Sequence, residues 1–190
     1  MIENIQQHLI PVDQPGQKQV DFRCAAVLVP LVKNEQDGHW QVIFTRRAEH
    51  LKHHPGQISF PGGGFEKQDR DLSHTAIRET GEEIGIRPEH IQLIGRLPQQ
   101  RTISQYNVTP FVGTVAPEHQ ISLDTNEVAE VFRAPFAFVT APTNQEKVVE
   151  SINGKDYSFY VIRYKHYNIW GATAKILVNL SRRLTPDSAQ

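Results

Sequence analysis

The sequence has few of the features that point to a secreted, membrane or nucleic-acid-binding protein. Its 190 residues include one cysteine, Cys24, which excludes a disulfide within the chain and fits a reducing compartment. The formal net charge is −1, so no overall basic field favours nucleic acid or an anionic membrane as a partner. Any recognition of an anion must therefore be local.

Long hydrophobic runs are missing too. The longest, Cys24–Val32, is too short to span a bilayer and contains Pro30. The first ten residues, MIENIQQHLI, have neither the basic start nor the continuous apolar stretch of a secretory signal. We expect a soluble cytoplasmic protein, in which Cys24 is a small buried side chain.

The composition favours one folded unit. Hydrophobic residues make up 38% of the chain, which is enough for an ordinary core without covalent cross-links. No internal repeat, low-complexity segment or linker divides the sequence. We expect a single domain over residues 1–190, with a short helix and a loop in residues 1–20 and a loose tail at 185–190.

Hydrophobic periodicity and turn residues predict many strands and a few helices. Helices are expected at Leu72–Ile84, capped by Asp71 or Ser73 and stopped by Gly85, and at Gly171–Leu184. Strands are expected at Cys24–Val32, Trp40–Thr45, Ile91–Leu97, Val108–Val115, Val128–Phe132, Glu146–Ile152 and Tyr157–Tyr164, the last two joined at Asn153-Gly154. Arg46–Ser59 follows neither period and is expected to be a long loop. The order of elements predicts an α/β or α+β sandwich and leaves the topology open.

The helix expected in the middle of the chain carries an unusual set of charges. Four residues fall within roughly 140° of one another on its surface: Arg78, Glu79, Glu82 and Glu83. Carboxylates on one side of a helix repel each other unless a cation is present, and carboxylate oxygens are the ligands that Mg²⁺ prefers. A solvated helix face is the alternative, but Gly81 weakens a helix by about 1 kcal/mol, which a merely solubilising helix would not favour.

Three consecutive glycines precede this helix, in the stretch FPGGG. Glycine lets the backbone approach a ligand closely, although a plain turn would also use it. Together with the later RETGEEIGI, the stretch resembles the box of the Nudix hydrolases: Gly, five residues, Glu, seven residues, then Arg-Glu-apolar-any-Glu-Glu-any-Gly-apolar. The second half matches, with Thr80 in an apolar position.

The first half of the box allows two alignments. Counting back puts Gly64 in the glycine position but Arg70 where the glutamate belongs. If Gly63 is the equivalent glycine, the loop carries one inserted residue. The partner of Arg78 is left open among three acids: Glu66, Asp69 and Asp71.

An upstream stretch resembles one subfamily, the coenzyme A pyrophosphatases, and their bacterial branch in particular. Its signature is an apolar pair, Thr, any, Arg, Ser or Ala, three residues, Arg, three residues, Gly, three residues and Phe-Pro-Gly-Gly. This chain reads Ile43-Phe44-Thr45-Arg46-Arg47-Ala48, then Lys52, Gly56 and Phe60-Pro61-Gly62-Gly63, so Lys52 alone departs and keeps the charge. The resemblance continues through NEVAEVF and IWGATAKIL and covers most of the chain.

The resemblance implies a fold and an activity. The fold would be α/β, a Nudix α/β/α sandwich with a mixed β-sheet. The activity would be hydrolysis of the diphosphate bond of coenzyme A or its thioesters, with Mg²⁺ or Mn²⁺, to 4′-phosphopantetheine and adenosine 3′,5′-bisphosphate. Another nucleoside diphosphate derivative, ADP-ribose or a dinucleotide, is the alternative substrate. A non-catalytic nucleotide-binding module is a further alternative, but it would typically lack box carboxylates. Neither nucleic acid nor a membrane is expected as a partner, and a homodimer is left open.

The resemblance also implies roles for single residues. Carried over by position, Glu79 and Glu83 hold the metal ion, with Glu82 as a third ligand or a ligand to a second ion. Arg78 orients a carboxylate. Glu127 is the candidate general base, with an ordinary exposed acid as the alternative interpretation. The backbone of Gly62, Gly63 and Gly64 approaches the metal and the substrate.

The segment Arg46–His54 is rich in cations for a protein near neutrality. Arg46, Arg47 and Lys52 predict a local anion site, which would suit the 3′-phosphate of coenzyme A. A flexible basic surface loop is the alternative. A zinc site of His50, His53 and His54 is disfavoured, because no cysteine supports it and adjacent histidines do not easily share one tetrahedral ion.

Overall fold

The computed structural model describes residues 1–14, 23–102, 104–152 and 154–185. Within these ranges the helices are α1 (Ile2–Gln7), α2 (Leu72–Ile84), α3 (Phe136–Thr140) and α4 (Gly171–Leu184), with the 3-10 turns η1 (Pro88–His90) and η2 (Pro142–Asn144). The strands are β1 (Arg23–Lys33), β2 (Trp40–Arg47), β3 (Ile58–Ser59), β4 (Gly62–Gly64), β5 (Ile91–Arg96), β6 (Gln100–Arg101), β7 (Tyr106–Val115), β8 (Val128–Pro135), β9 (Glu146–Ile152), β10 (Lys155–Tyr164) and β11 (Tyr167–Trp170).

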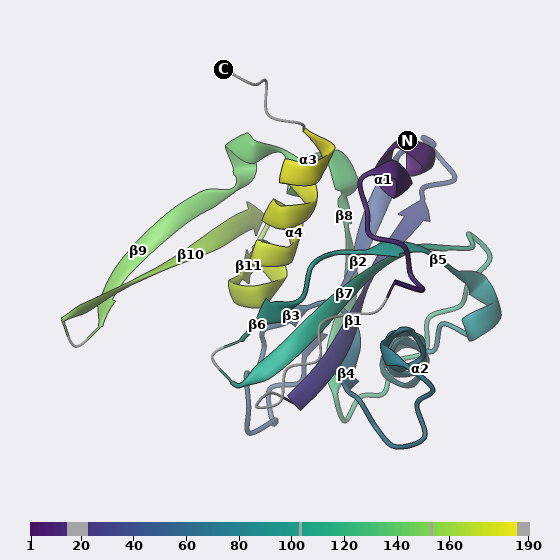
Figure 1. The fold of residues 1–190 in the computed structure, drawn as a ribbon, viewed down its shortest axis with the longest axis horizontal. Coiled ribbons are helices and arrows are strands. Elements are labelled where there is room, and N and C mark those ends of the chain that lie inside the picture. The colour runs from purple at the N-terminus through teal and green to yellow at the C-terminus, as the bar shows by residue number, and fades with distance from the viewer. Residues whose placement is uncertain (15–22, 103, 153, 186–190) are drawn as a thin grey trace.

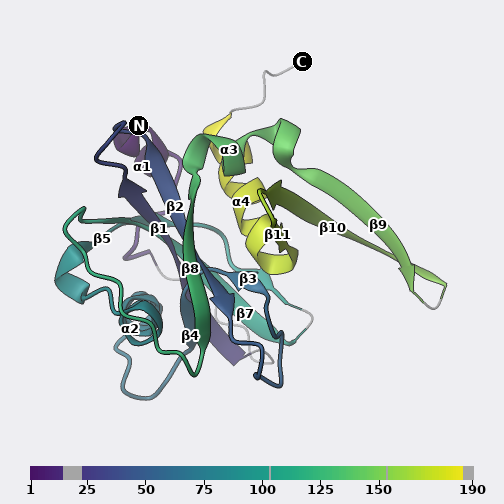
Figure 2. The same ribbon diagram turned by 180° about the vertical axis from the view of Figure 1, so that it is seen from behind.

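The main sheet is mixed and lies between helices. Its order is β3-β2-β1-β7-β5, with β8 paired to β2, β4 to β1 and β6 to β7. β1 and β7 run parallel, and the other neighbours run antiparallel. α2 covers one face, while α4 lies with β11 on the other (Figures 1 and 2). This arrangement confirms the mixed α/β fold that the sequence predicts.

The central strand β1 is buried on both sides, because successive residues of a strand point to opposite faces. Leu28 packs with Ala76 of α2, whereas Val29 and Leu31 belong to the larger cluster that includes α4. Burial begins two residues into the strand, and Cys24 is exposed at its first end. The expectation of a buried Cys24 is therefore wrong, since the buried part of the strand starts at Ala25.

The two long helices have the predicted bounds, and in α2 the end signals are local. The Asp71 carboxylate accepts a hydrogen bond from the backbone N–H of His74 at 2.9 Å, so Asp71 is the cap and Ser73 is not. Gly85 ends α2 in the left-handed conformation, with φ of 73°.

Several short elements depart from the sequence prediction. The expected loop Arg46–Ser59 is shorter, because β2 extends to Arg47 and β3 occupies Ile58–Ser59. The glycine run forms β4 rather than a loop, since it pairs with β1. α3 and β11 were not predicted. These segments are too short to show a period of their own, and long-range partners stabilise them.

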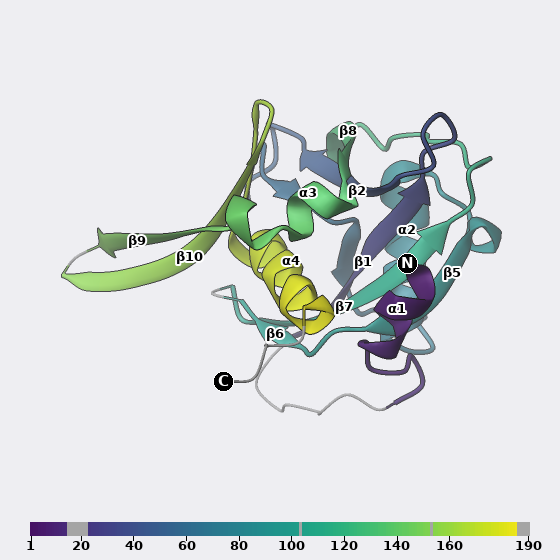
Figure 3. The ribbon, with the colours of Figure 1, turned by 90° about the horizontal axis from the view of Figure 1, so that it is seen from above.

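A second sheet, in the order β11-β10-β9, extends from the α4 side. Figure 3 shows the β9–β10 ribbon projecting away from the rest of the fold. The two strands confirm the predicted hairpin, although Asn153 itself lies outside the described residues, as do most of the loop expected before residue 20 and the tail after 185. Over the described ranges, no helix has the length and apolar character needed to cross a membrane.

Candidate active site

The site is built where β1 and β2 separate. The two strands pair only between Leu31–Lys33 and Trp40–Val42. Beyond that point β3 pairs with β2, and β4 pairs with β1. The segment that crosses this gap brings the glycine run against α2.

Within the glycine run, Gly63 is the residue that contacts the acidic helix. A Cβ on Gly63 would lie 2.4 Å from Cδ of Glu79, whereas a Cβ on Gly64 would have no atom within 4 Å. Gly63 therefore corresponds to the glycine of the box. Counted from it, five residues separate the glycine from Asp69, and one residue is inserted between Asp69 and Arg78.

Asp69 is the partner of Arg78 that the sequence left open. Its Oδ1 accepts from Arg78 Nε at 2.8 Å and its Oδ2 from Nη2 at 3.1 Å, which is a bidentate pair. The backbone N–H of Glu66 and the hydroxyl of Thr75 donate to Oδ2, and His74 lies 3.0 Å from Oδ1. The Arg78 guanidinium is the main cause that holds the pKa of the buried Asp69 carboxyl well below its usual range.

Arg78 also contacts the other side of the box. Its Nη1 donates to Glu82 at 2.7 Å, and its Nη2 lies 2.9 Å from a Glu79 oxygen. The same Nη2 donates to the carbonyl of Gly64 at 3.2 Å. The guanidinium therefore links the glycine strand β4, the loop before α2 and two box carboxylates. Its contacts are all made within the protein.

Glu83 is the unusual carboxylate of the site. It is 4% exposed, and its Oε2 has no hydrogen-bond partner. Burial is the largest cause that raises its pKa to about 8, followed by the nearby charges of Glu79 and Glu127. The charge of Arg47 and a backbone hydrogen bond from Gly62 act in the opposite direction. Burial likewise raises the pKa of Glu79.

The segment before β8 places Glu127 beside these carboxylates. The backbone N–H groups of Ser122 and Asp124 donate to the carbonyls of Ile84 and Glu83, at 3.0 and 3.1 Å. The carbonyl of Glu127 then accepts from Ala48, at 2.8 Å. The side chain of Glu127 is exposed, and its charge raises the pKa of both Glu79 and Glu83.

This donor set fits a hard divalent cation. An oxygen that is buried without a partner, beside two further carboxylates, is costly unless a cation or a proton neutralises it. Over the described ranges, no three His, Cys, Asp or Glu side chains are arranged as a ready-made metal cluster. Water, backbone carbonyls and substrate oxygens would complete the shell, as is usual for Mg²⁺. The same finding gives no support to a zinc site at the histidines of the Arg46–His54 segment.

The three predicted anion-binding residues have different surroundings. Arg47 lies close enough to Glu83 to lower its pKa. Arg46 instead donates to Glu130 at 3.0 Å and to Glu49 at 2.9 Å. Lys52 is exposed in the turn after β2. The structure thus separates Arg46 from the acidic site, and Glu130 was not singled out from the sequence because its partner is 84 residues away.

Comparison with known proteins decides the family of this chain. The NUDIX domain model matches residues 22–151, which is more than half of the chain. The chain belongs to the Nudix hydrolase family. A protein of Enterobacter sp. (strain 638), named uncharacterized Nudix hydrolase NudL, is 37% identical over 85% of this chain and 83% of its own length. A Klebsiella pneumoniae subsp. pneumoniae protein of the same name is 34% identical over 90% of this chain and 88% of its own length.

Solved structures agree with this Nudix hydrolase in fold. An Ap4A hydrolase of C. elegans, in a binary complex, superposes with a TM-score of 0.50 at 19% identity, over 60% of this chain and 80% of that one. The Nudix hydrolase RenU of M. Smegmatis gives a TM-score of 0.51 at 17% identity, over 67% and 78%. At these identities the likeness concerns the fold alone.

Proposed function

We propose that this Nudix hydrolase is a coenzyme A diphosphatase that acts in the cytoplasm. It would convert coenzyme A or its thioesters to 4′-phosphopantetheine and adenosine 3′,5′-bisphosphate. The observation that best supports hydrolysis at this site is the buried, unpartnered oxygen of Glu83 beside Glu79 and Glu127. Mg²⁺ and Mn²⁺ bind carboxylate oxygens of this kind.

The reaction needs water, a base and charge stabilisation. A water oxygen bonds to one phosphorus of the diphosphate, the bridging P–O bond breaks, and the bridging oxygen leaves with the other phosphate. A divalent cation held by Glu79 and Glu83, with Glu82 as a further ligand, would stabilise the charge that develops on the phosphoryl oxygens. Glu127, exposed beside both carboxylates, accepts the proton of the attacking water. Arg78 holds Glu79 in position and does not itself contact the substrate.

The choice of coenzyme A rests on the upstream signature that ends at Phe60-Pro61-Gly62-Gly63. Arg47, near the carboxylates, would bind the diphosphate, and the exposed Lys52 would bind the 3′-phosphate. ADP-ribose and dinucleotides lack that 3′-phosphate, and they are the alternative substrates. The presence of all three box carboxylates disfavours a non-catalytic module.

The first prediction concerns the substrate and Glu83 together. With Mg²⁺ or Mn²⁺, the wild type should cleave coenzyme A faster than ADP-ribose or a diadenosine dinucleotide, with products resolved by mass. Glu83→Gln should lower turnover by about a hundredfold or more with the fold retained. Glu127→Gln should lower it by roughly ten- to a thousandfold.

Glu89→Gln removes an exposed carboxylate in η1 and serves as the matched control, with wild-type turnover expected. Near-wild-type turnover of Glu83→Gln at saturating metal would refute the assignment of Glu83. Cleavage of the other substrates with coenzyme A left intact would refute coenzyme A as the substrate, while hydrolysis by a Nudix enzyme would still be supported.

The second prediction concerns Lys52. Lys52→Ala should raise KM for coenzyme A by about tenfold, since a charged hydrogen bond contributes about 1.5–3 kcal/mol. It should leave 3′-dephospho-coenzyme A nearly unaffected. Lys175→Ala removes the same charge from the exposed side of α4 and should change neither substrate. Equal losses on both substrates would mean that Lys52 does not read the 3′-phosphate.

A further inference from the structure

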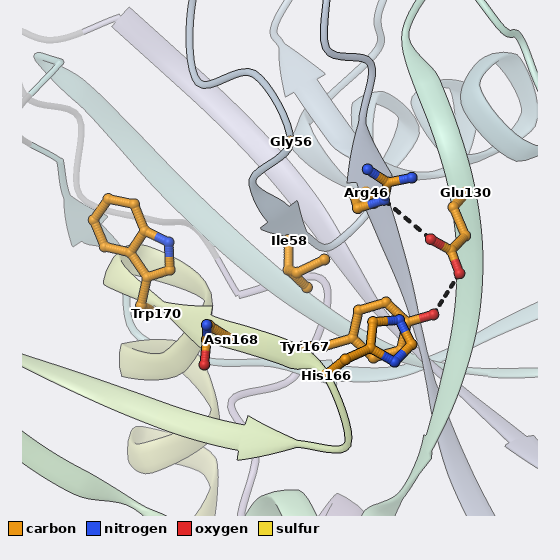
Figure 4. Close-up of a pocket in the computed structure, with 8 residues that line it drawn as sticks. All are labelled: Arg46, Gly56, Ile58, Glu130, His166, Tyr167, Asn168 and Trp170. Carbon is orange, nitrogen blue, oxygen red and sulfur yellow. Dashed lines mark hydrogen bonds and ion pairs between the residues drawn. The ribbon is translucent and has the colours of Figure 1, made fainter.

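A pocket lies on the face of the sheet opposite α2, and no carboxylate of the candidate active site lines it. Its volume is about 490 Å³, which is in the range of small-molecule sites. β2, β3 and β8 form one wall and β11 the other (Figure 4). Arg46 lies in this wall, while its neighbour Arg47 acts on Glu83, so the two consecutive residues connect the two sites.

Arg46 and Glu130, which both lie in the pocket wall, form an ion pair, and His166 lies against Tyr167 with ring centroids 3.9 Å apart. Nε of Arg46 donates to Glu130 at 3.0 Å, and the hydroxyl of Tyr167 donates to the other Glu130 oxygen. A second carboxylate, that of Glu49, binds Nη1 of Arg46 at 2.9 Å. Two carboxylates against one guanidinium leave no excess of positive charge around Arg46 to favour an anion. The pocket therefore suits a neutral polar group better than a phosphate.

Aromatic rings and one amide make up much of the remaining wall. Tyr167 is held by stacking on Phe132, with ring centroids 3.6 Å apart and planes 6° apart. Trp170 is 43% exposed and contacts Phe159 edge-on at 6.1 Å, so much of the indole is open to solvent. In Figure 4, Asn168 lies between Trp170 and Tyr167, on the outward side of β11 that also carries Trp170.

These groups match the surface of a purine base. An exposed indole stacks on a planar heterocycle, and such stacking contributes about 1–3 kcal/mol for each base. A side-chain amide offers one donor and one acceptor, the combination that pairs with the edge of adenine. A charge-paired wall completes a site for a flat, neutral, hydrogen-bonding ring.

We propose that the pocket between β2, β3 and β11 binds a purine base, with Trp170 stacking on the ring and Asn168 pairing with its edge. The identification of this base with the adenine of the substrate rests on the function proposed above. A substrate whose diphosphate lies at Arg47 and Glu83 would pass over the end of β2 to reach it.

The test uses tryptophan fluorescence, because the chain has two tryptophans, Trp40 and Trp170. In a Trp40→Phe variant Trp170 is the sole reporter. Titration with AMP or adenosine 3′,5′-bisphosphate, without metal, should quench it saturably with a Kd below about 1 mM. Adding Asn168→Ala should weaken binding about tenfold, and adding Asn179→Ala, a change on α4 outside the pocket, should not.

Binding and turnover separate the two proposals. Quenching by adenine nucleotides without cleavage of coenzyme A would support the base pocket and refute the coenzyme A assignment. Cleavage of coenzyme A without quenching would overturn the pocket proposal alone. Quenching by 4′-phosphopantetheine but not by AMP would also overturn it, since the pocket would then bind the other half of the substrate.

Discussion

The three glycines of β4 meet different surroundings. Gly62 has φ of 156°, and a Cβ on it would lie 2.3 Å from the backbone carbonyl oxygen of Ala26, so no side chain fits there. At Gly63 the obstacle is the flexible end of Glu79, and at Gly64 there is none. Gly62 thus meets a backbone requirement, Gly63 lies against the Glu79 side chain, and Gly64 is an open position.

The third prediction compares the last two of these glycines. The methyl group of Gly63→Ala should displace the Glu79 carboxylate and lower turnover by about tenfold or more, while stability changes by less than about 1 kcal/mol, because a side chain can move away. Gly64→Ala should resemble the wild type in both respects. Steady-state kinetics and urea denaturation would check this. Equal turnover of the two variants would show that the Gly63–Glu79 contact does not position Glu79.

At the scale of elements, one ion pair connects the loop after β4 to α2. Asp69 is fully buried at its side chain, and Arg78 is 12% exposed at its own. Removing one partner of a buried, hydrogen-bonded pair typically costs about 3–5 kcal/mol. The box segment therefore depends on this pair for its shape as well as for the position of Glu79.

The fourth prediction is that Asp69→Asn lowers the free energy of unfolding by about 3 kcal/mol near neutral pH. Because the folded pKa of Asp69 lies below its ordinary value of 3.8, the ionised pair stabilises the fold fully above that value. The contribution is lost as the pH falls through the lower folded pKa. The gap in the free energy of unfolding between wild type and variant should therefore become smaller below about pH 4.

Urea denaturation at a series of pH values measures this gap, and Asp156→Asn, at an exposed position of β10, is the control. A gap that stays constant into acid would mean that the substitution acts through packing instead of charge.

At the scale of the whole molecule, burial is uneven. β1 and β7 lie at the centre of the main sheet, with packed residues on both faces. The β9–β10 ribbon projects from the body, and Val149 and Tyr157 on it are 60% and 45% exposed. A ribbon of two strands with little cover is marginally stable by itself.

The fifth prediction is that backbone amides of the β9–β10 ribbon exchange with deuterium at least about a hundredfold faster than those of β1 and β7, because opening the ribbon exposes little apolar surface. Hydrogen exchange read by mass spectrometry at low protein concentration measures this. Equal protection in both regions would contradict it, and would indicate that something covers the ribbon in solution. The single domain over residues 1–190 and the homodimer stay predictions.

The sequence by itself determined the features that depend on neighbouring residues. Asp71 and Gly85 end α2 through contacts within one turn, so both bounds could be predicted. The acidic set on α2 follows from helical spacing, and the Nudix box follows from residues within one short segment. These patterns were enough for the family and for a cation-binding hypothesis.

Only the tertiary structure decided which distant groups meet. It selected Asp69 for Arg78, assigned Gly63 to the box, paired Arg46 with Glu130 and exposed Cys24. β3 and β4 are strands because they pair with β2 and β1, and β11, which pairs with the adjacent β10, is packed in place by the stack of Tyr167 on Phe132; two to four residues have no detectable period of their own. The physical reason is common to all of these: the energy of a contact depends on distance in space, and a sequence records only distance along the chain.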